Sequence, residues 1–136
     1  MADREDFIAW TQSRLREAET ALHNGDAEPR LALWSSREPV SVLGAWRSAT
    51  GQEEVRDLFR ALAETFSDCI SHVYDIVSAE VIGDMAFTAG YERTEASINA
   101  ERRQYVLRVT QIYRREEGEW KVAHRHGDTA EIATED

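Results

Sequence analysis

Two histidines and an aspartate stand two residues apart near the end of the chain, in the stretch WKVAHRHGD at residues 120–128. If this stretch is a β-strand, the side chains of His124, His126 and Asp128 leave one face at intervals of about 6.6 Å. Two imidazoles at that spacing could hold one metal ion or act as acid and base, whereas Asp128 lies too far along to join them. The third alternative is a structural strand whose side chains need partners.

The neighbouring strand argues against a metal ion. A three-residue turn at 116–118 would pair the last two strands and place Arg108 opposite His126. A cation then stands where a metal site needs a third ligand. We therefore predict no metal here, structural or interface contacts for His124 and His126, and an ion pair between Arg108 and Asp128.

The same register sorts the side chains of this hairpin onto two faces, because directly opposed residues share a face. The predicted outer face carries Arg108, Thr110, Ile112, Arg114, Trp120, Val122, His124, His126 and Asp128. The predicted inner face carries Leu107, Val109, Gln111, Tyr113, Lys121, Ala123, Arg125 and Gly127. We expect the row Met85, Phe87, Ala89, Tyr91 and Arg93 of the preceding strand to join the inner face.

The inner face predicts a ligand pocket with apolar walls and a polar floor. The predicted walls are Trp46, Phe87, Tyr91, Leu107 and Val109, and the predicted floor is Arg93, Gln111 and Arg125. Because guanidinium groups present a planar fork to carboxylate or phosphate, the expected ligand is a small anionic or enolisable molecule. In the alternative, Arg93 pairs with a helix acid such as Glu53 or Glu54, and Arg125 reaches solvent.

Proton-transfer catalysis in this pocket would need a carboxylate, and the predicted pocket face of the last three strands has none. Asp75, in HVYDIV, is the best candidate because its apolar neighbours would raise its pKa. Tyr91 is the second candidate, and Tyr74 points away from Asp75. The alternative for Asp75 is an exposed strand residue.

Helices come first along the chain and strands afterwards. Apolar periodicity predicts a helix over 3–22, a short helix with Pro29 in its first turn, and a helix that begins with a capping box, Thr50-x-x-Glu53. Strands are predicted over 39–43, 72–82, 85–94, 105–115 and 119–128. This order indicates an α+β fold in which the helices cover one side of an antiparallel sheet.

Composition limits the partners. The 136 residues suit a single domain, 1–136, with 129–136 as an acidic tail, and the net charge of −10 argues against nucleic acid. No apolar run approaches the ~20 residues of a membrane span, and the N-terminus does not resemble a signal peptide. The single cysteine, Cys69, allows no intrachain disulfide. We expect a cytoplasmic bacterial protein without a cofactor.

The segments GDMAFTAGYERT, LRVTQIYRREEGEWKVAHRHGD, PVSVLGAW and TGQEEVRDLFRALAETFSD resemble the SnoaL-like branch of the nuclear transport factor 2-like superfamily. Members include ketosteroid isomerases, polyketide cyclases, dehydratases and the association domain of calcium/calmodulin-dependent kinase II. The resemblance implies a bent sheet wrapped around a pocket, closed by helices, and a homodimer through the outer sheet face. Arg93 matches a pocket arginine of the association domain, whereas Gln111 and Gly127 stand where two others would be.

Three functions follow from these patterns. We favour a small-molecule-binding homodimer. The second is an isomerase, cyclase or dehydratase that acts on an enolisable ketone, with Asp75 or Tyr91 in the acid/base role. The third is an oligomerisation module.

Overall fold

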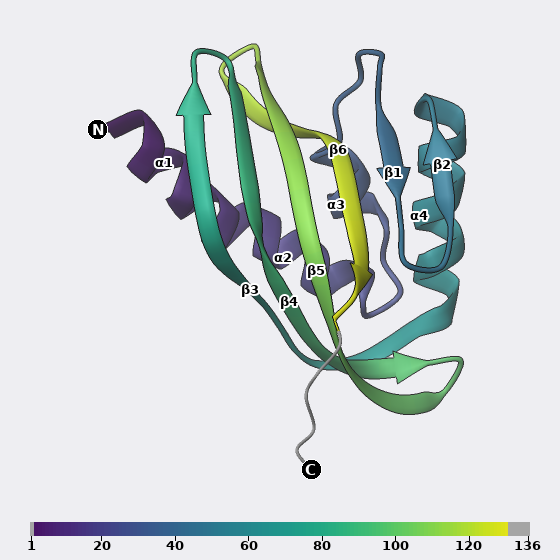
Figure 1. The fold of residues 1–136 in the computed structure, drawn as a ribbon. Helices are drawn as coiled ribbons and strands as arrows, with labels where there is room; N and C mark the ends of the chain where they lie inside the picture. The colour runs from purple at the N-terminus through teal and green to yellow at the C-terminus, as the bar shows by residue number, and fades with distance from the viewer. Residues whose placement is uncertain (1, 131–136) are drawn as a thin grey trace.

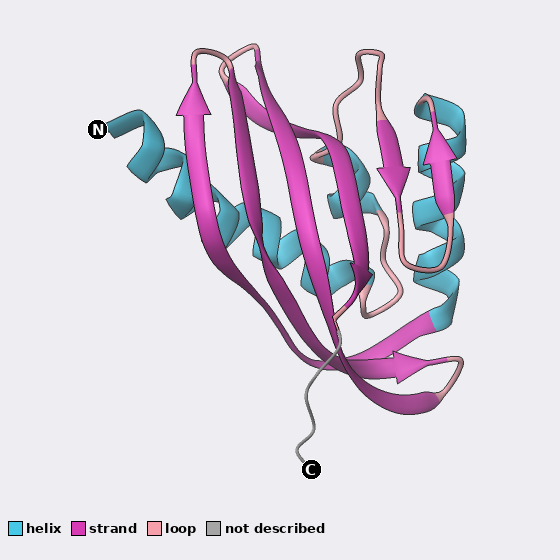
Figure 2. Ribbon diagram, in the orientation of Figure 1, coloured by secondary structure: helices cyan, strands magenta, loops and turns pink. Residues whose placement is uncertain are grey.

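The computed structural model describes residues 2–130, in which helices cover one face of a strongly bent sheet (Figures 1 and 2). The predicted first helix is confirmed as one continuous segment of α1 (Ala2–Trp10), a π-helical turn η1 (Thr11–Leu15) and α2 (Arg16–Leu22). The residues at both junctions keep right-handed helical angles, so the chain passes through the π-helical turn without a break. The 3.6-residue apolar period gave no sign of this turn.

The second predicted helix is also confirmed, as α3 (Glu28–Ala32), with Pro29 in its first turn. The predicted capping box of α4 (Gln52–Thr65) is wrong. Thr50 instead ends a short strand, β2 (Ser48–Thr50), and Gly51 is the N-cap, with φ of 87°. Glycine adopts this positive φ without strain, so the chain turns from the strand directly into the helix.

Six strands form one sheet in the order β2-β1-β6-β5-β4-β3. The short strand β1 (Ser41–Leu43) is followed in the chain by the long strands β3 (Phe66–Ile82), β4 (Met85–Ile98), β5 (Glu101–Glu116) and β6 (Glu119–Thr129). The α+β class and the bent sheet are confirmed, although β1 runs parallel to β6, so the sheet is mixed rather than antiparallel. Thr129 still pairs with Leu107, and residues 131–136 of the predicted tail lie outside the described residues.

The β4–β5 hairpin is longer than predicted because polar residues continue both strands as far as Ile98 and Glu101. Asn99 and Ala100 form its turn, both with positive φ, as a type I′ turn requires. The end of this hairpin bends toward the C-terminal end of α4 (Figure 1). In this extension the side chains of Glu95 and Arg102 form an ion pair from one strand to the other, at 3.2 Å.

The β5–β6 turn has two residues, not the predicted three. Glu117 and Gly118 both have positive φ, and Glu116 lies opposite Glu119. A β-bulge follows, since Tyr113 pairs with Val122 but Ile112 pairs with His124, which leaves Ala123 as an extra residue.

This turn and bulge together decide which side chains of β6 point inward. Trp120 and Val122 lie buried in the core, so their predicted place on the outer face is wrong. Beyond the bulge the predicted alternation returns, with Arg125 on the inner side and His124 and His126 on the outer side. The predicted register is wrong, because Thr110 and not Arg108 lies opposite His126, and Arg108 lies opposite Asp128.

The face predicted for β4 is wrong as well. Tyr91 lies opposite Arg108, and Arg93 lies opposite Val106, so both belong to the outer face together with Phe87. The inner row of β4 is Ala86, Thr88, Gly90, Glu92, Thr94 and Ala96. The row with the large apolar side chains faces outward, and a row of small residues with three polar ones, Thr88, Glu92 and Thr94, faces the helices, the reverse of the usual pattern on which the prediction relied.

Candidate functional site

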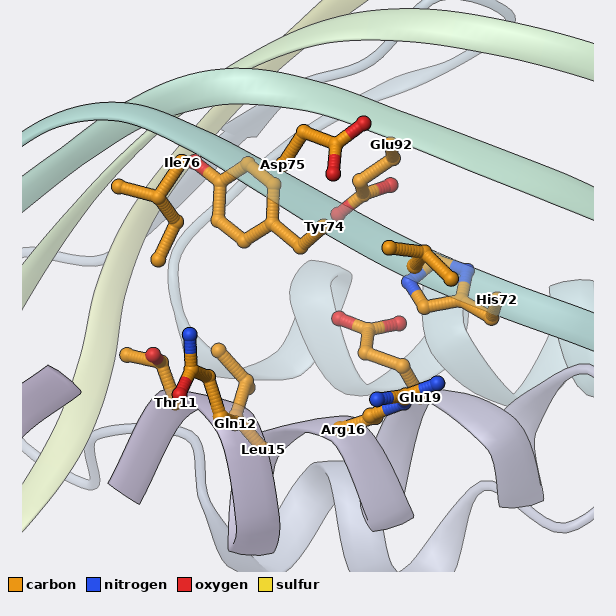
Figure 3. Close-up of a pocket in the computed structure, with 11 residues that line it drawn as sticks. Thr11, Gln12, Leu15, Arg16, Glu19, His72, Tyr74, Asp75, Ile76 and Glu92 are labelled. Atoms are coloured by element: carbon orange, nitrogen blue, oxygen red, sulfur yellow. The ribbon is translucent and has the colours of Figure 1, made fainter. Parts of the chain in front are cut away.

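A cavity of about 410 Å³ lies between the N-terminal helical segment and strand β3 (Figure 3). Its lining comes from the helices, from β3 and from one residue of β4. The lining residues are Thr11, Gln12, Leu15, Arg16, Glu19, His72, Val73, Tyr74, Asp75, Ile76 and Glu92.

The helical wall includes the π-helical turn. Thr11, Gln12 and Leu15 all belong to η1, and the Thr11 hydroxyl donates to the carbonyl of Ile8 at 2.6 Å. Single π-helical turns occur frequently at functional sites, because the extra residue re-aims the side chains around it.

Strand β3 sends alternate side chains to the two sides of the sheet. His72 and Tyr74 point toward the helices, opposite Thr94 and Glu92 of β4. Asp75 points away from the helices, as Figure 3 shows. A bulge at Val77 reverses this alternation farther along the strand.

His72 is a buried polar side chain of this cavity with one ring nitrogen left unsatisfied. It is only 3% exposed, and its Nδ1 lies 2.9 Å from the Thr94 hydroxyl. Its Nε2 is buried and has no hydrogen-bond partner among residues 2–130. A buried nitrogen left without a partner costs about 1–3 kcal/mol, so a group that reached it from the cavity would be stabilised.

Two buried carboxylates share the cavity with His72. Glu92 accepts hydrogen bonds from Arg125 at 2.6 and 2.7 Å. Burial alone would raise the pKa of Glu92, but the charge and hydrogen bonds of Arg125 outweigh burial and lower the pKa to about 2. Glu92 is therefore an anion at neutral pH.

Glu19 is held in a second ion pair. Oε2 of Glu19 lies 2.7 Å from Nε of Arg30, without the angle of a hydrogen bond. Burial would raise the pKa of Glu19, but the nearby Arg30 charge gives a net lowering. The Arg30 guanidinium also lies over the rings of Trp34 and Phe59, at 5.1 and 5.0 Å from their centroids.

Gln111 joins the two ion pairs. Its Oε1 accepts from Arg30 at 3.1 Å and from Arg125 at 3.2 Å, and its Nε2 donates to the Tyr113 hydroxyl at 2.6 Å. Gln111 and Arg125, which were predicted for the pocket floor, lie on the inner face but do not line this cavity, and a carboxylate already pairs with each of the arginines Arg30 and Arg125.

The structure brings together only some of the predicted site residues. Trp46 and Arg125 share a second cavity of about 60 Å³, where Trp46 is 56% exposed. Val109 is buried on the inner face, and its carbonyl accepts from Tyr74 at 3.0 Å.

The remaining predicted residues lie on the outer face. Arg93 donates to Asp75 at 2.7 Å, with side chains 58% and 51% exposed. Arg93 does have an acidic partner, but that partner is on the adjacent strand and not on a helix. Phe87 and Tyr91 lie on the same face and are partly exposed.

Sequence reasoning missed His72, Glu19 and Glu92. One available signal was Glu19 itself, a carboxylate on the apolar stripe of Leu15, Ala18 and Leu22, where a charge needs a partner. A second was the parity of β3, since His72 and Tyr74 must share a face. Glu92 gave no comparable signal, because its face depends on the β4–β5 register.

The histidine pair of β6 lies apart from this cavity. His124 Nδ1 is 2.8 Å from the Ser41 hydroxyl, and Arg108 donates to both oxygens of Asp128 at 3.0 Å, as predicted. Within residues 2–130 no three or more histidine, cysteine, aspartate or glutamate side chains are grouped to hold a metal ion. In the same part of the chain no helix is long and apolar enough to cross a membrane.

Solved structures with this fold come from several bacteria. A proposed dehydratase of the nuclear transport factor 2-like family from Streptomyces avermitilis has a TM-score of 0.75 and 18% identity, covering 96% of this chain and 98% of that one. A ketosteroid isomerase-like protein from Erwinia carotovora atroseptica has a TM-score of 0.72 and 17% identity, covering 91% and 96%. A nuclear transport factor 2-like superfamily protein from Salmonella enterica serovar Typhimurium has a TM-score of 0.75 and 13% identity, covering 98% and 96%.

These identities establish a shared fold and no shared activity. No curated protein sequence matches the chain. The SnoaL-like domain matches residues 7–129, which include both walls of the cavity and all six strands. The chain belongs to the SnoaL-like domain family.

Proposed function

We propose that the protein binds a small polar molecule in the cavity between the N-terminal helices and β3, with His72 as the anchor. The observation that carries this proposal is that His72 lines the cavity while its buried Nε2 has no hydrogen-bond partner among the described residues, so a small shift of the ring would let a ligand supply one. A cavity of about 410 Å³ falls within the range of small-molecule sites.

The charges of the cavity favour a neutral ligand over the predicted anion. The carboxylates of Glu19 and Glu92 line the cavity, whereas Arg30 and Arg125 do not line it and are already paired with these carboxylates. Arg16 is the one cation among the lining residues, against the two buried carboxylates. To reach Arg30 or Arg125, an incoming anion would have to displace a buried ion pair, which costs several kcal/mol.

An NMR titration with acetamide as a neutral probe and acetate as an anionic probe tests this proposal. We expect acetamide to shift the ring signals of His72 and acetate to shift them much less. In the backbone amide signals of other lining residues such as Thr11 and Val73, His72→Phe should abolish the acetamide response, while His126→Phe, on the exposed end of β6, should retain it. A response to acetamide that survives His72→Phe, or none in the wild type, would contradict the proposal.

Proton transfer is the second candidate, and one observation favours it over binding alone. Nδ1 of His72 lies 2.9 Å from the Thr94 hydroxyl, and Nε2 has no partner among the described residues, an arrangement that would suit an oriented general base once a substrate reached the ring. Asp75, the predicted base, is exposed and paired with Arg93, so the acid/base role passes to His72. The dehydratase and isomerase-like names of the structural neighbours agree with this chemistry.

Deuterium exchange into the α-position of cyclohexanone, followed by NMR in D2O, tests the second candidate. We expect the protein to accelerate exchange above the buffer rate, and His72→Gln to remove the acceleration. Exchange at the buffer rate would leave binding as the function.

We also propose a homodimer through the outer sheet face, defined by Met85, Phe87, Tyr91, His124 and His126. The three apolar side chains are at least 36% exposed on adjacent positions of β4. A group of exposed aromatic and methionine side chains on one face is typical of an interface.

A further inference from the structure

We infer that Arg16 binds an anionic second end of the ligand at the mouth of the cavity, so that the ligand class is a small amide that carries a carboxylate at its other end. This inference rests on the proposed binding site and adds a specificity-determining residue to it. The end of the ligand that enters the cavity stays neutral, and the anionic end stays at the rim.

The helical wall of the cavity has two rows of side chains, each with a spacing of four residues (Figure 3). The inner row is Thr11, Leu15 and Glu19, all of them buried. The outer row is Gln12 and Arg16, both of them exposed. Residues four apart lie on the same side of a helix, so the outer row forms the rim at which the cavity meets solvent.

Every carboxylate that lines the cavity already has an arginine as its partner. Two of these ion pairs are buried, and the third lies on the exposed outer face of the sheet. The pairs are Glu19 with Arg30, Glu92 with Arg125, and Asp75 with Arg93, at 2.7, 2.6 and 2.7 Å. The carboxylate charges of the lining are therefore neutralised without Arg16.

Arg16 is the guanidinium that these pairs leave over. It has no ion pair with any residue in the range 2–130, although Glu19 is only three positions farther along the same helix. Glu19 belongs to the inner row and pairs with Arg30 instead. Arg16 directly follows the π-helical turn and has regular helical angles, so the helix fixes its place on the rim. A guanidinium there offers its planar fork of N–H donors to a carboxylate.

The rim is also the place where an anionic group costs least to bind. Arg16 is exposed, so a carboxylate beside it keeps part of its hydration and displaces no buried ion pair. The net charge of −10 repels anions at long range, but salt at 0.1 M screens this repulsion beyond about 10 Å. The local charge of Arg16 therefore decides whether an anionic end is favoured.

A matched pair of ligands, succinamate and succinamide, tests the inference by NMR titration. Both carry one primary amide, and their other end is a carboxylate in succinamate and a second amide in succinamide. The backbone amide signals of Thr11 and Val73, which line the cavity, report binding. An exposed ion pair contributes little, so we expect the wild type to bind succinamate about two- to fivefold more tightly than succinamide.

Arg16→Met should bind the two ligands equally, and Arg16→Lys should keep most of the preference because it keeps the charge. Arg14→Met is the matched control. It removes the same charge from an exposed arginine of the same helical segment that does not line the cavity, and it should keep the wild-type preference. In about 1 M salt the preference should disappear, since charges at the surface are then screened within a few ångströms.

Equal wild-type affinities for the two ligands would overturn this inference and leave the proposed binding site intact. A preference that survives Arg16→Met, or that Arg14→Met removes to the same extent, would also overturn it. Failure of both ligands to shift the lining signals of the wild type would contradict the proposed function itself, and the inference would fall with it.

Discussion

Both carboxylate oxygens of Glu92 accept hydrogen bonds from Arg125, at 2.6 and 2.7 Å, and the side chains are only 4% and 13% exposed. Glu92 comes from the inner row of β4, and Arg125 reaches it from β6 across β5. The bulge in β6 makes this meeting possible, because it keeps Arg125 on the inner face although the turn of the hairpin has only two residues.

Removing one partner of this pair should strongly destabilise the fold. Glu92→Gln leaves the Arg125 charge buried without its counterion, and we expect a loss of about 3–5 kcal/mol in the free energy of unfolding. Urea denaturation measures the loss. Glu95→Gln, which breaks the more exposed pair with Arg102, is the control and should cost less than about 1 kcal/mol. Similar losses for the two variants would show that the Glu92–Arg125 pair stabilises no more than a surface pair.

Stability should fall in acid for the same reason. The pKa of Glu92 is about 2 in the folded protein against an ordinary value of 4.5, so the unfolded chain binds the proton more tightly. The stabilisation from this carboxylate is present above pH 4.5 and is lost as the pH falls toward 2. A difference of this size corresponds to about 3 kcal/mol. Over this pH range, the free energy of unfolding should fall more steeply with decreasing pH for the wild type than for Glu92→Gln. The same pH dependence in both proteins would contradict the assignment.

Arg93 should contribute little to stability or to cavity binding. It pairs with Asp75 on the exposed outer face, where ion pairs contribute about 0–1 kcal/mol. We expect the free energies of unfolding of Arg93→Met and Asp75→Asn to lie within about 1 kcal/mol of the wild-type value. Arg93→Met, which changes no lining residue, should also retain the acetamide response of His72. If Arg93→Met abolished binding, the site would lie on the outer face and our cavity assignment would be wrong.

Gly90 should tolerate no larger residue, because it lies against the bulge of β3. A Cβ at this position would be 2.1 Å from the carbonyl oxygen of Asp75 and 2.9 Å from Cα of Ile76, both backbone atoms. Gly90→Ala should therefore lower the melting temperature markedly. Gly127→Ala is the matched control, since its nearest contact would be an ordinary 3.6 Å to Val109. A melting temperature for Gly90→Ala as high as for this control would show that the bulge can move.

The outer sheet face should carry the dimer. Phe87→Glu places a charge among the exposed apolar side chains of β4, and we expect it to convert a dimer into a monomer in sedimentation experiments at micromolar concentration. Ile70→Glu changes an equally apolar, exposed residue outside this group and should leave the dimer intact. A monomeric wild type, or a dimer that survives Phe87→Glu, would remove the proposed interface.

The sequence alone determined those features that depend on local chemistry. The apolar period predicted the first helix, Pro29 marked the second, and the β-branched and aromatic runs located the four long strands. The outward direction of His124 and His126 was also predicted, because it depends only on strand alternation beyond the bulge. The ion pair of Arg108 with Asp128 was predicted as well, although the predicted register placed Arg108 opposite His126 and the structure places it opposite Asp128.

Only the tertiary structure decided which side chains meet inside the sheet. One extra residue in a strand reverses the faces of all the side chains that follow it. The two-residue turn at 117–118 and the bulge at Ala123 therefore determine the faces of Trp120, Val122 and their neighbours in β6. The bulge at Val77 does the same for the end of β3. In β4 the polar row faces inward because Glu92 finds Arg125 there, and Thr88 and Thr94 find hydroxyl and imidazole partners there. The hydrophobic pattern of a strand cannot show that a charged side chain has a buried partner two strands away. For this reason the sequence predicted the fold but not the cavity that His72 lines.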